Sequence, residues 1–141
     1  MTGELPRPEP VVSPEARRFW EATGEQRLRL QRCSECAAVV WYPRGICPDC
    51  SSSNLDWFEA SGRGLVYSFT INHRGTGPYE GIGPYILAYV ELEEGPRMLT
   101  NIVDCDSEKL RIGQLVEVRF ADTGTGTALV RFTPVETVAD G

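Results

Sequence analysis

Four of the five cysteines stand in two Cys-x-x-Cys pairs, and this spacing constrains the fold more than any other feature of the chain. Cys33 and Cys36 form the first pair, and Cys47 and Cys50 form the second after ten intervening residues. Each pair makes a tight turn that brings two sulfurs to one side, so two facing turns make a tetrahedral set of thiolates. The spacing therefore predicts one zinc ion in a closed site, with no open position for a substrate or a reactive water.

Two other uses of the same cysteines stay open at the level of sequence. A tetrahedral set of sulfurs also suits iron of the rubredoxin kind. Against iron, Ala37 and Ser51 follow the second cysteine of each pair, where electron-transfer turns usually carry glycine. Two disulfides are the other alternative, and paired spacings of this kind are more typical of metal sites in intracellular chains. We therefore favour zinc over iron, and either metal over disulfides.

Composition excludes several classes of protein. The 141 residues suffice for one average domain or two small ones, and 41% of them are hydrophobic. No apolar run approaches the ~20 residues of a membrane span, and the N-terminus lacks the apolar segment of a secretory signal. Five cysteines in such a chain predict that the protein is located in the reducing cytoplasm. A net charge of −6 without any basic run disfavours binding to a nucleic-acid backbone.

The residue pattern divides the chain into a lead-in with a helix, a zinc ribbon, a barrel and a tail, over residues 1–26, 27–58, 59–135 and 136–141. Prolines among polar residues predict a disordered or extended start. Ser13 then suits the N-cap of a helix, Pro14 its first position and Gly24 its stop. In the ribbon, residues 28–32 and 39–42 read as strands, joined to the second cysteine pair by a turn at 43–45. A ribbon this small buries little apolar surface, so the metal is expected to supply its folding free energy.

From residue 60 onwards the hydrophobic pattern has a period of two, which is typical of strands. In the first of these strands Leu65, Tyr67, Phe69 and Ile71 are expected to share one face. Four more strands follow, marked by alternating residues: Ile86, Ala88, Val90 and Leu92; Met98, Thr100 and Ile102; Val116, Val118 and Phe120; Ala128, Val130 and Phe132. One helical turn is predicted at 107–110, before the fourth strand. This order predicts a mainly β fold with a five-stranded OB-fold barrel, and an SH3-like barrel stays open as the alternative.

Several motifs occur in one order along residues 13–135: Ser13-Pro14 with Phe19-Trp20-Glu21-Ala22, Leu30-Gln31-Arg32-Cys33-x-x-Cys36, Pro43-Arg44-x-x-Cys47-Pro48-x-Cys50, Pro84-Tyr85-Ile86-Leu87-Ala88-Tyr89-Val90-Glu91-Leu92-Glu93-Glu94-Gly95, Leu110-Arg111-Ile112-Gly113-Gln114-Leu115-Val116-Glu117-Val118 and Phe132-Thr133-Pro134. Together they resemble the zinc-ribbon plus OB-fold family of acyl-CoA-associated proteins, long filed as a domain of unknown function. Members of that family pair with thiolase-fold enzymes or hot-dog-fold enoyl-CoA hydratases. Others are fused to a hydratase domain in bacterial steroid side-chain degradation, where they partner a thiolase-like retro-aldolase.

The resemblance implies a fold and a role for this chain. The fold is an N-terminal helix, a rubredoxin-like zinc ribbon whose ligands are the four paired cysteines, and an OB-fold barrel. The role is that of a non-catalytic scaffold subunit in a hetero-oligomer with a thiolase-like enzyme or an enoyl-CoA hydratase. The chain would then contribute to acyl-CoA processing indirectly, because the partner enzyme would bind the acyl-CoA.

A search for catalytic residues agrees with such a role. His73 is the only histidine, and no neighbouring base would activate Cys105, the unpaired cysteine. The glycine-rich loop over residues 75–84 lacks a phosphate-binding motif. We therefore expect no catalytic residues and no activity from the chain alone.

Aromatic residues outside the expected cores define a candidate partner or substrate-channel surface: Phe19, Trp20, His73, Tyr79 and Tyr85. The alternative for the first two is that they pack back on the ribbon. A different function also stays open, because zinc ribbons and OB folds are common in single-stranded nucleic-acid-binding modules. The scattered arginines and the negative balance favour the scaffold, with no nucleic acid and no membrane as partners.

Overall fold

The computed structural model describes residues 5–135, so the predicted tail at 136–141 lies outside the described residues. A helical segment comes first, formed by η1 (Pro14–Ala16) and α1 (Arg17–Gly24). The ribbon strands are β1 (Arg29–Cys33), β2 (Val39–Val40) and β3 (Leu55–Glu59). The barrel strands are β4 (Arg63–Asn72), β5 (Tyr85–Leu92), β6 (Arg97–Ile102), β7 (Leu115–Asp122) and β8 (Ala128–Pro134), with η2 (Gly77–Tyr79) between the first two. None of the described helices is long and apolar enough to cross a membrane.

The barrel has the strand order of an OB fold. Its strands follow one another as β4-β5-β6-β8-β7, and β7 pairs with β4 to close the circle. All pairings are antiparallel except that of β6 with β8, which run parallel where Ile102 meets Phe132. A closed five-stranded barrel of mixed direction confirms the OB-fold prediction over the SH3-like alternative.

The predicted inward faces are confirmed in β5 and β6 and wrong in β4. Val90 and Ile102 are completely buried, in line with the alternation expected for their strands. In β4, by contrast, Val66 is buried while Leu65 and Tyr67 are exposed. The pairing with β5 shifts by one residue between Val66 and Ser68, which marks a β-bulge. A bulge inserts one residue into the strand, so the side chains beyond it change faces, and the first half of β4 cannot share a face with Phe69 and Ile71.

The predicted helical turn at 107–110 is also wrong. Residues 107–109 form a hydrogen-bonded turn, not a helix. The Lys109 amide donates to the Asp106 carbonyl at 3.0 Å, and the Glu108 amide donates to the Asp106 carboxylate at 3.0 Å. The aspartate side chain therefore satisfies the backbone locally, which is a common alternative to helix formation.

The helix begins after Ser13 and ends at Gly24 as predicted, but the contacts at its two ends differ from the expected ones. The Ser13 side chain caps no amide, and the helix starts as a 3₁₀ turn at Pro14. At the other end Gln26, with φ of 61°, takes the left-handed conformation expected of Gly24. Gly24 is needed for another reason, since a Cβ atom there would lie 2.1 Å from the carbonyl oxygen of Gly126. Packing against the β7–β8 turn, not helix termination, explains this glycine.

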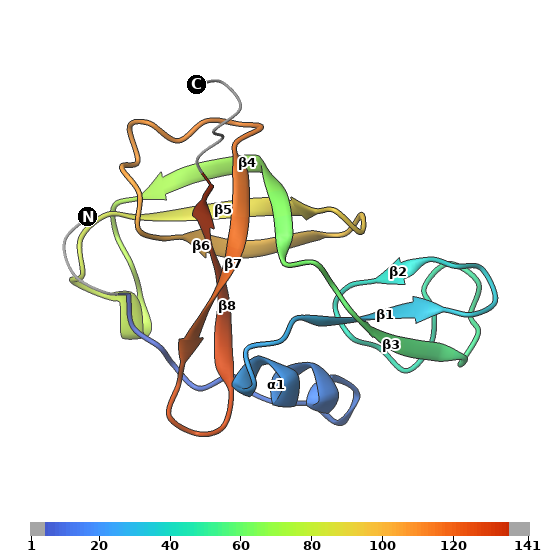
Figure 1. Ribbon diagram of the computed structural model, residues 1–141. Helices are drawn as coiled ribbons and strands as arrows, with labels where there is room; N and C mark the ends of the chain where they lie inside the picture. The colour runs from blue at the N-terminus through green and yellow to red at the C-terminus, as the bar shows by residue number, and fades with distance from the viewer. Residues whose placement is uncertain (1–4, 136–141) are drawn as a thin grey trace.

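The helix joins the ribbon to the barrel. Figure 1 shows α1 beside the ends of β8 and β1, with the ribbon projecting to one side of the barrel. Phe19 of α1 and Leu30 of β1 belong to the same continuous apolar core as Phe132 of β8. The buried Thr23 hydroxyl also accepts a hydrogen bond from the Ala128 amide at 3.0 Å. The ribbon end nearest the helix is therefore held by apolar packing that it shares with the barrel.

The ribbon itself is a three-stranded sheet with β1 in the centre. The second predicted strand is shorter than expected and ends at Val40. The turn after it is held by the buried Gln31 side chain, which accepts from the Arg44 amide at 2.8 Å and donates to the Arg44 carbonyl at 2.9 Å. This paired contact holds the turn against β1.

Candidate metal centre and aromatic cleft

The two Cys-x-x-Cys turns have the same backbone geometry. In each turn, the residue after the second cysteine donates its amide to the carbonyl of the first cysteine: Ala37 to Cys33 at 2.8 Å, and Ser51 to Cys47 at 2.9 Å. Both donors have a φ of 67°, in the left-handed region. In each turn an amide also points at the first sulfur: Glu35 to Cys33 Sγ and Asp49 to Cys47 Sγ, both at 3.4 Å. Such amides favour the thiolate form that binds metals.

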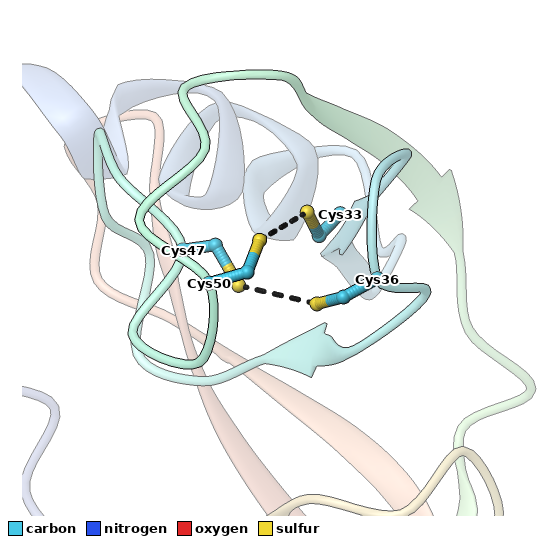
Figure 2. Close-up of side chains that lie close together, drawn as sticks. All are labelled: Cys33, Cys36, Cys47 and Cys50. Carbon is cyan, nitrogen blue, oxygen red and sulfur yellow. Dashed lines mark hydrogen bonds between the residues drawn. The ribbon is translucent and has the colours of Figure 1, made fainter.

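The four sulfurs form a compact cluster. Figure 2 shows them pointing toward one another from the two turns, and all four lie within 4.8 Å of one another. The Cys33 and Cys50 sulfurs are 3.5 Å apart, and those of Cys36 and Cys47 are 3.6 Å apart. Disulfide sulfurs would be about 2 Å apart, so these cysteines are free thiols. A tetrahedral site with Zn–S bonds of about 2.3 Å needs sulfurs roughly 3.8 Å apart, which this cluster fits.

The thiols of the cluster differ in acidity. The pKa of Cys33 is lowered to about 7, because hydrogen bonds from the Cys36 and Glu35 backbone outweigh the effect of burial. For Cys50, a backbone hydrogen bond from Ser52 lowers the pKa, but the hydrogen bond with Cys33 and burial outweigh it and raise the pKa to about 12. Metal binding has to displace the protons that the cluster retains.

The remaining thiol has none of these features. Cys105 lies apart from the cluster and is half-buried. Burial raises its pKa, and the nearby carboxylates of Asp106 and Asp104 raise it further. A raised pKa keeps the thiol protonated, which is the opposite of what a nucleophile needs.

Phe19 does not present a surface to a partner, so its assignment to the candidate partner surface is wrong. Its ring is 1% exposed and makes edge contacts with Trp20 and Trp41, at centroid distances of 4.9 and 5.1 Å. The alternative interpretation, that Phe19 packs within the chain, is therefore the correct one. Trp20 is only half-buried, and its indole N–H donates to the Tyr42 hydroxyl at 2.8 Å.

Three of the proposed surface residues, the buried Phe19 together with Trp20 and Tyr79, line a cleft of about 280 Å³. Tyr85 is buried behind the cleft, where its ring contacts that of Tyr79 at 5.3 Å and its hydroxyl accepts from Asn72 at 2.8 Å. His73 is exposed and does not line the cleft. The sequence search missed other lining residues, which come from separate segments of the chain: Trp41, Tyr42, Leu99, Leu129 and Arg131. We call this hollow the aromatic cleft.

The outer face of the barrel carries a second apolar feature that the sequence search missed. Tyr67, Tyr89 and Leu99 lie on three neighbouring strands and are 46%, 46% and 57% exposed. Tyr89 and Leu99 stand directly opposite each other across β5 and β6. We call these three residues the outer sheet patch. Alternation with core residues was the available signal: it places Tyr89 and Leu99 on the outward sides of β5 and β6, whereas the outward position of Tyr67 depends on the β4 bulge.

The ribbon, its four clustered cysteines and the closed barrel define a zinc-ribbon plus OB-fold protein. Residues 20–56 match the family model of the ChsH2 rubredoxin-like zinc ribbon domain, and residues 57–121 match that of the ChsH2 C-terminal OB-fold domain. The chain is 37% identical over 127 residues to a DUF35 domain-containing scaffold protein of Methanocaldococcus jannaschii, with 84% of this chain and 90% of that protein covered. The chain belongs to the DUF35 family, as its motifs predict.

Two further relatives have names that refer to enzymes. The chain is 35% identical over 128 residues to a probable enoyl-CoA hydratase alpha subunit of Thermomonospora curvata, and this match covers 91% of the chain but only 40% of that protein. Among solved structures, one named as an Ltp2-ChsH2(DUF35) aldolase matches with a TM-score of 0.79 and 34% identity, over 89% of this chain and 98% of that one.

Proposed function

We propose that this chain is a non-catalytic accessory subunit that binds a thiolase-fold enzyme or an enoyl-CoA hydratase and supports acyl-CoA processing. The match to a protein named as a scaffold, over most of both chains, carries this proposal. The name of the similar solved structure, which joins a DUF35 chain to Ltp2 in an aldolase, supports an enzyme partner. Steroid side-chain acyl-CoA is the first substrate class to test, because the family resemblance includes that pathway.

We propose further that Cys33, Cys36, Cys47 and Cys50 hold one zinc ion per chain. Four sulfurs at tetrahedral spacing support a closed structural site, in which the metal stabilises the ribbon and exposes no reactive water. Free thiols of this kind fit a reducing compartment, so we propose the cytoplasm. Elemental analysis measures the metal directly, and a red preparation with a visible absorption band would indicate iron instead.

The outer sheet patch is the surface that we propose for contact with the enzyme. Aromatic and aliphatic side chains exposed on neighbouring strands are typical of protein interfaces, where such residues often dominate the binding free energy. The Arg97 guanidinium lies 3.8 Å above the Tyr67 ring and pairs with Glu91, so a polar rim borders the patch. Apolar centres with polar rims are the usual arrangement of interfaces.

A pull-down with mass spectrometry tests the proposal. We expect the wild-type chain to retain a thiolase-fold enzyme or a hydratase from its native host, and the Tyr89→Ser/Leu99→Ser double variant to lose it. Ile112→Ser is the matched control, because Ile112 is equally exposed and lies outside the patch. If the folded double variant still retains the enzyme, the interface lies outside the outer sheet patch. Capture of oligonucleotides at moderate salt, with no enzyme, would instead support the nucleic-acid-binding alternative.

Activity assays test the accessory role. The isolated chain is expected to turn over no acyl-CoA, whereas the reconstituted complex is expected to be active, and steroid side-chain and short-chain acyl-CoA substrates should be compared. A robust hydratase, thiolase or aldolase rate from the isolated chain would contradict a non-catalytic role.

A further inference from the structure

Arg131 is a buried cation without a carboxylate partner among the described residues. It is 5% exposed although it lies on the outer side of β8, between the core-facing Val130 and Phe132. Its Nη2 atom donates to the Pro6 carbonyl and, at 3.3 Å, to the Tyr79 hydroxyl. Both acceptors are neutral, and none of the ion pairs in residues 5–135 includes Arg131. Charged side chains are rarely buried to this degree without a counter-charge.

The other donors of this guanidinium reach open space. Nε and Nη1 of Arg131 make no hydrogen bond within the described residues, yet neither is a buried unpaired atom. Within the same residues, the buried unpaired atoms are Arg29 Nε and Glu94 Oε1. Since Arg131 lines the aromatic cleft, that cleft is the open space that its free donors reach.

A second arginine adds to the positive charge at this place. Arg119 of β7 stands directly opposite Arg131 of β8, so both side chains leave the sheet on the same face. The contact between Arg119 and Glu117, at 4.0 Å, is long and exposed and therefore weak. Like charges facing each other across two strands repel, and an anion bound at Arg131 would reduce that repulsion.

The walls of the cleft limit which anion fits. They consist mainly of aromatic and aliphatic side chains, including Trp20, Trp41, Leu99 and Leu129. A phosphate would bring more oxygen atoms and more charge than one guanidinium in such walls can satisfy. A carboxylate brings one negative charge that the free Nε and Nη1 donors can satisfy, and it can carry an apolar body that suits the walls.

We propose that the aromatic cleft binds a small organic carboxylate with an apolar body, and that Arg131 holds its carboxylate group. The site does not depend on the scaffold role, and it shares only Leu99 with the outer sheet patch. The extended segment at Pro6 borders it and occupies only the Nη2 donor of Arg131 with a backbone carbonyl.

Binding of benzoate to the zinc-loaded wild-type chain tests this proposal, followed by calorimetry and by tryptophan fluorescence. Trp20 and Trp41 line the cleft, so occupancy should change the fluorescence directly. Benzamide has nearly the same shape without the charge, and acetate has the charge without the apolar body. We expect benzoate to bind about tenfold or more tightly than either, because hydrogen bonds to charged groups are the stronger kind. Equal binding of benzamide, no binding of benzoate, or tighter binding of inorganic phosphate would each overturn the proposal.

Variants locate the site. Arg131→Gln is expected to weaken benzoate binding by about tenfold or more, and Arg131→Lys by less, because lysine keeps the charge but loses the planar set of donors. Arg119→Gln is the matched control, since it removes the same charge from the opposite strand, and it should change the affinity by less than threefold, roughly the effect of a screened surface charge. An equal loss in Arg119→Gln and Arg131→Gln would show non-specific attraction and overturn the proposal. Should Arg131→Gln fail to fold, the comparison of benzoate with benzamide on the wild-type chain decides alone.

Discussion

The ribbon and the barrel are both small β structures, yet they are stabilised in different ways. Side chains such as Val66, Val90 and Phe132 fill the barrel and are almost completely inaccessible to water. In the ribbon, two of the most deeply buried side chains are Cys33 and Cys47, which belong to the metal centre. Burial of apolar surface therefore stabilises the barrel, whereas we expect the outer part of the ribbon to depend on a metal bound by the cysteine cluster.

The boundary between these two sources of stability runs through the ribbon. Leu28 and Leu30, at the start of the ribbon, join the core that the barrel and Phe19 share. The cysteine turns lie at the opposite end, where Cys36 and Cys50 are exposed. Loss of the metal should consequently disorder the turns first, while the helix end of the ribbon stays attached to the barrel.

Removal of the metal has the largest expected effect. Closed four-thiolate sites contribute an apparent ~10–16 kcal/mol in small zinc modules at neutral pH. Chelation, or the substitution Cys36→Ser, should therefore abolish amide protection in the cysteine turns and leave that of β5 and β6 largely intact, as measured by hydrogen exchange with mass spectrometry. Cys105→Ser is the control and should leave both regions unchanged. Full protection of the turns in a chain shown to be free of metal would contradict the idea that the metal stabilises the ribbon.

A cavity in the barrel should have the converse effect: it should destabilise the barrel and leave the metal centre of the folded protein intact. Phe132→Ala removes a fully buried ring and is expected to lower the free energy of unfolding by about 3–5 kcal/mol in urea titrations. The folded fraction should keep its metal, because the cysteine turns do not contact Phe132 through the core cluster. Leu99→Ala, at an exposed position of the barrel, should change stability by about 0.5 kcal/mol or less. Similar losses in the two variants would mean that the barrel core is not the main source of stability.

The contact between α1 and the barrel can be tested by a glycine-to-alanine substitution, because the contact reverses the sign of the expected change in stability. In an ordinary helix, alanine in place of glycine stabilises by about 0.5–1 kcal/mol. Gly24→Ala should instead destabilise by about 1–3 kcal/mol, because the new methyl group would overlap the Gly126 carbonyl. Gly45→Ala meets no atom closer than 3.9 Å and serves as the control in thermal unfolding. A stabilised Gly24→Ala variant would show that the helix does not pack this closely on the β7–β8 turn.

The smallest effect concerns the strain within a cysteine turn. Ala37 has a left-handed backbone, which disfavours a side chain by about 1–2 kcal/mol. Glycine removes that cost but gains freedom in the unfolded chain, so Ala37→Gly should stabilise the zinc-loaded protein by about 0.5–1 kcal/mol. Ala38→Gly, at the next position, should destabilise it by a similar amount. Thermal unfolding of both variants measures the difference, and a destabilised Ala37→Gly variant would contradict the strained turn.

Local patterns predict much of this molecule correctly. The spacing of the four cysteines predicts their cluster, because each Cys-x-x-Cys turn is closed by hydrogen bonds among its own few residues. The alternation in β5 and β6 likewise predicts the inward faces, since a regular strand leaves no choice once one side is apolar. In β4 the same reasoning fails at Tyr67, because one bulge residue reverses the alternation and no sequence signal marks it.

Predictions about exposure fail where distant segments meet. Phe19 and Trp20 are neighbours of equal apolar character, yet Phe19 is 1% exposed within the shared core while Trp20 is only half-buried. Gly24 looks like a helix stop but is required by the approach of Gly126. In each case the deciding contact comes from a part of the chain far away in sequence.

By itself, the sequence predicted which four cysteines lie together, the five strands of the barrel and the family. These features depend on spacing and periodicity, which operate over a few residues. Only the tertiary structure decided that Arg131 is buried without a carboxylate partner among the described residues and that it lines a cleft. The physical reason is that burial and charge pairing depend on which strands, helix and loop are brought together when the barrel closes, and an alternating pattern carries no information about what covers its outer face.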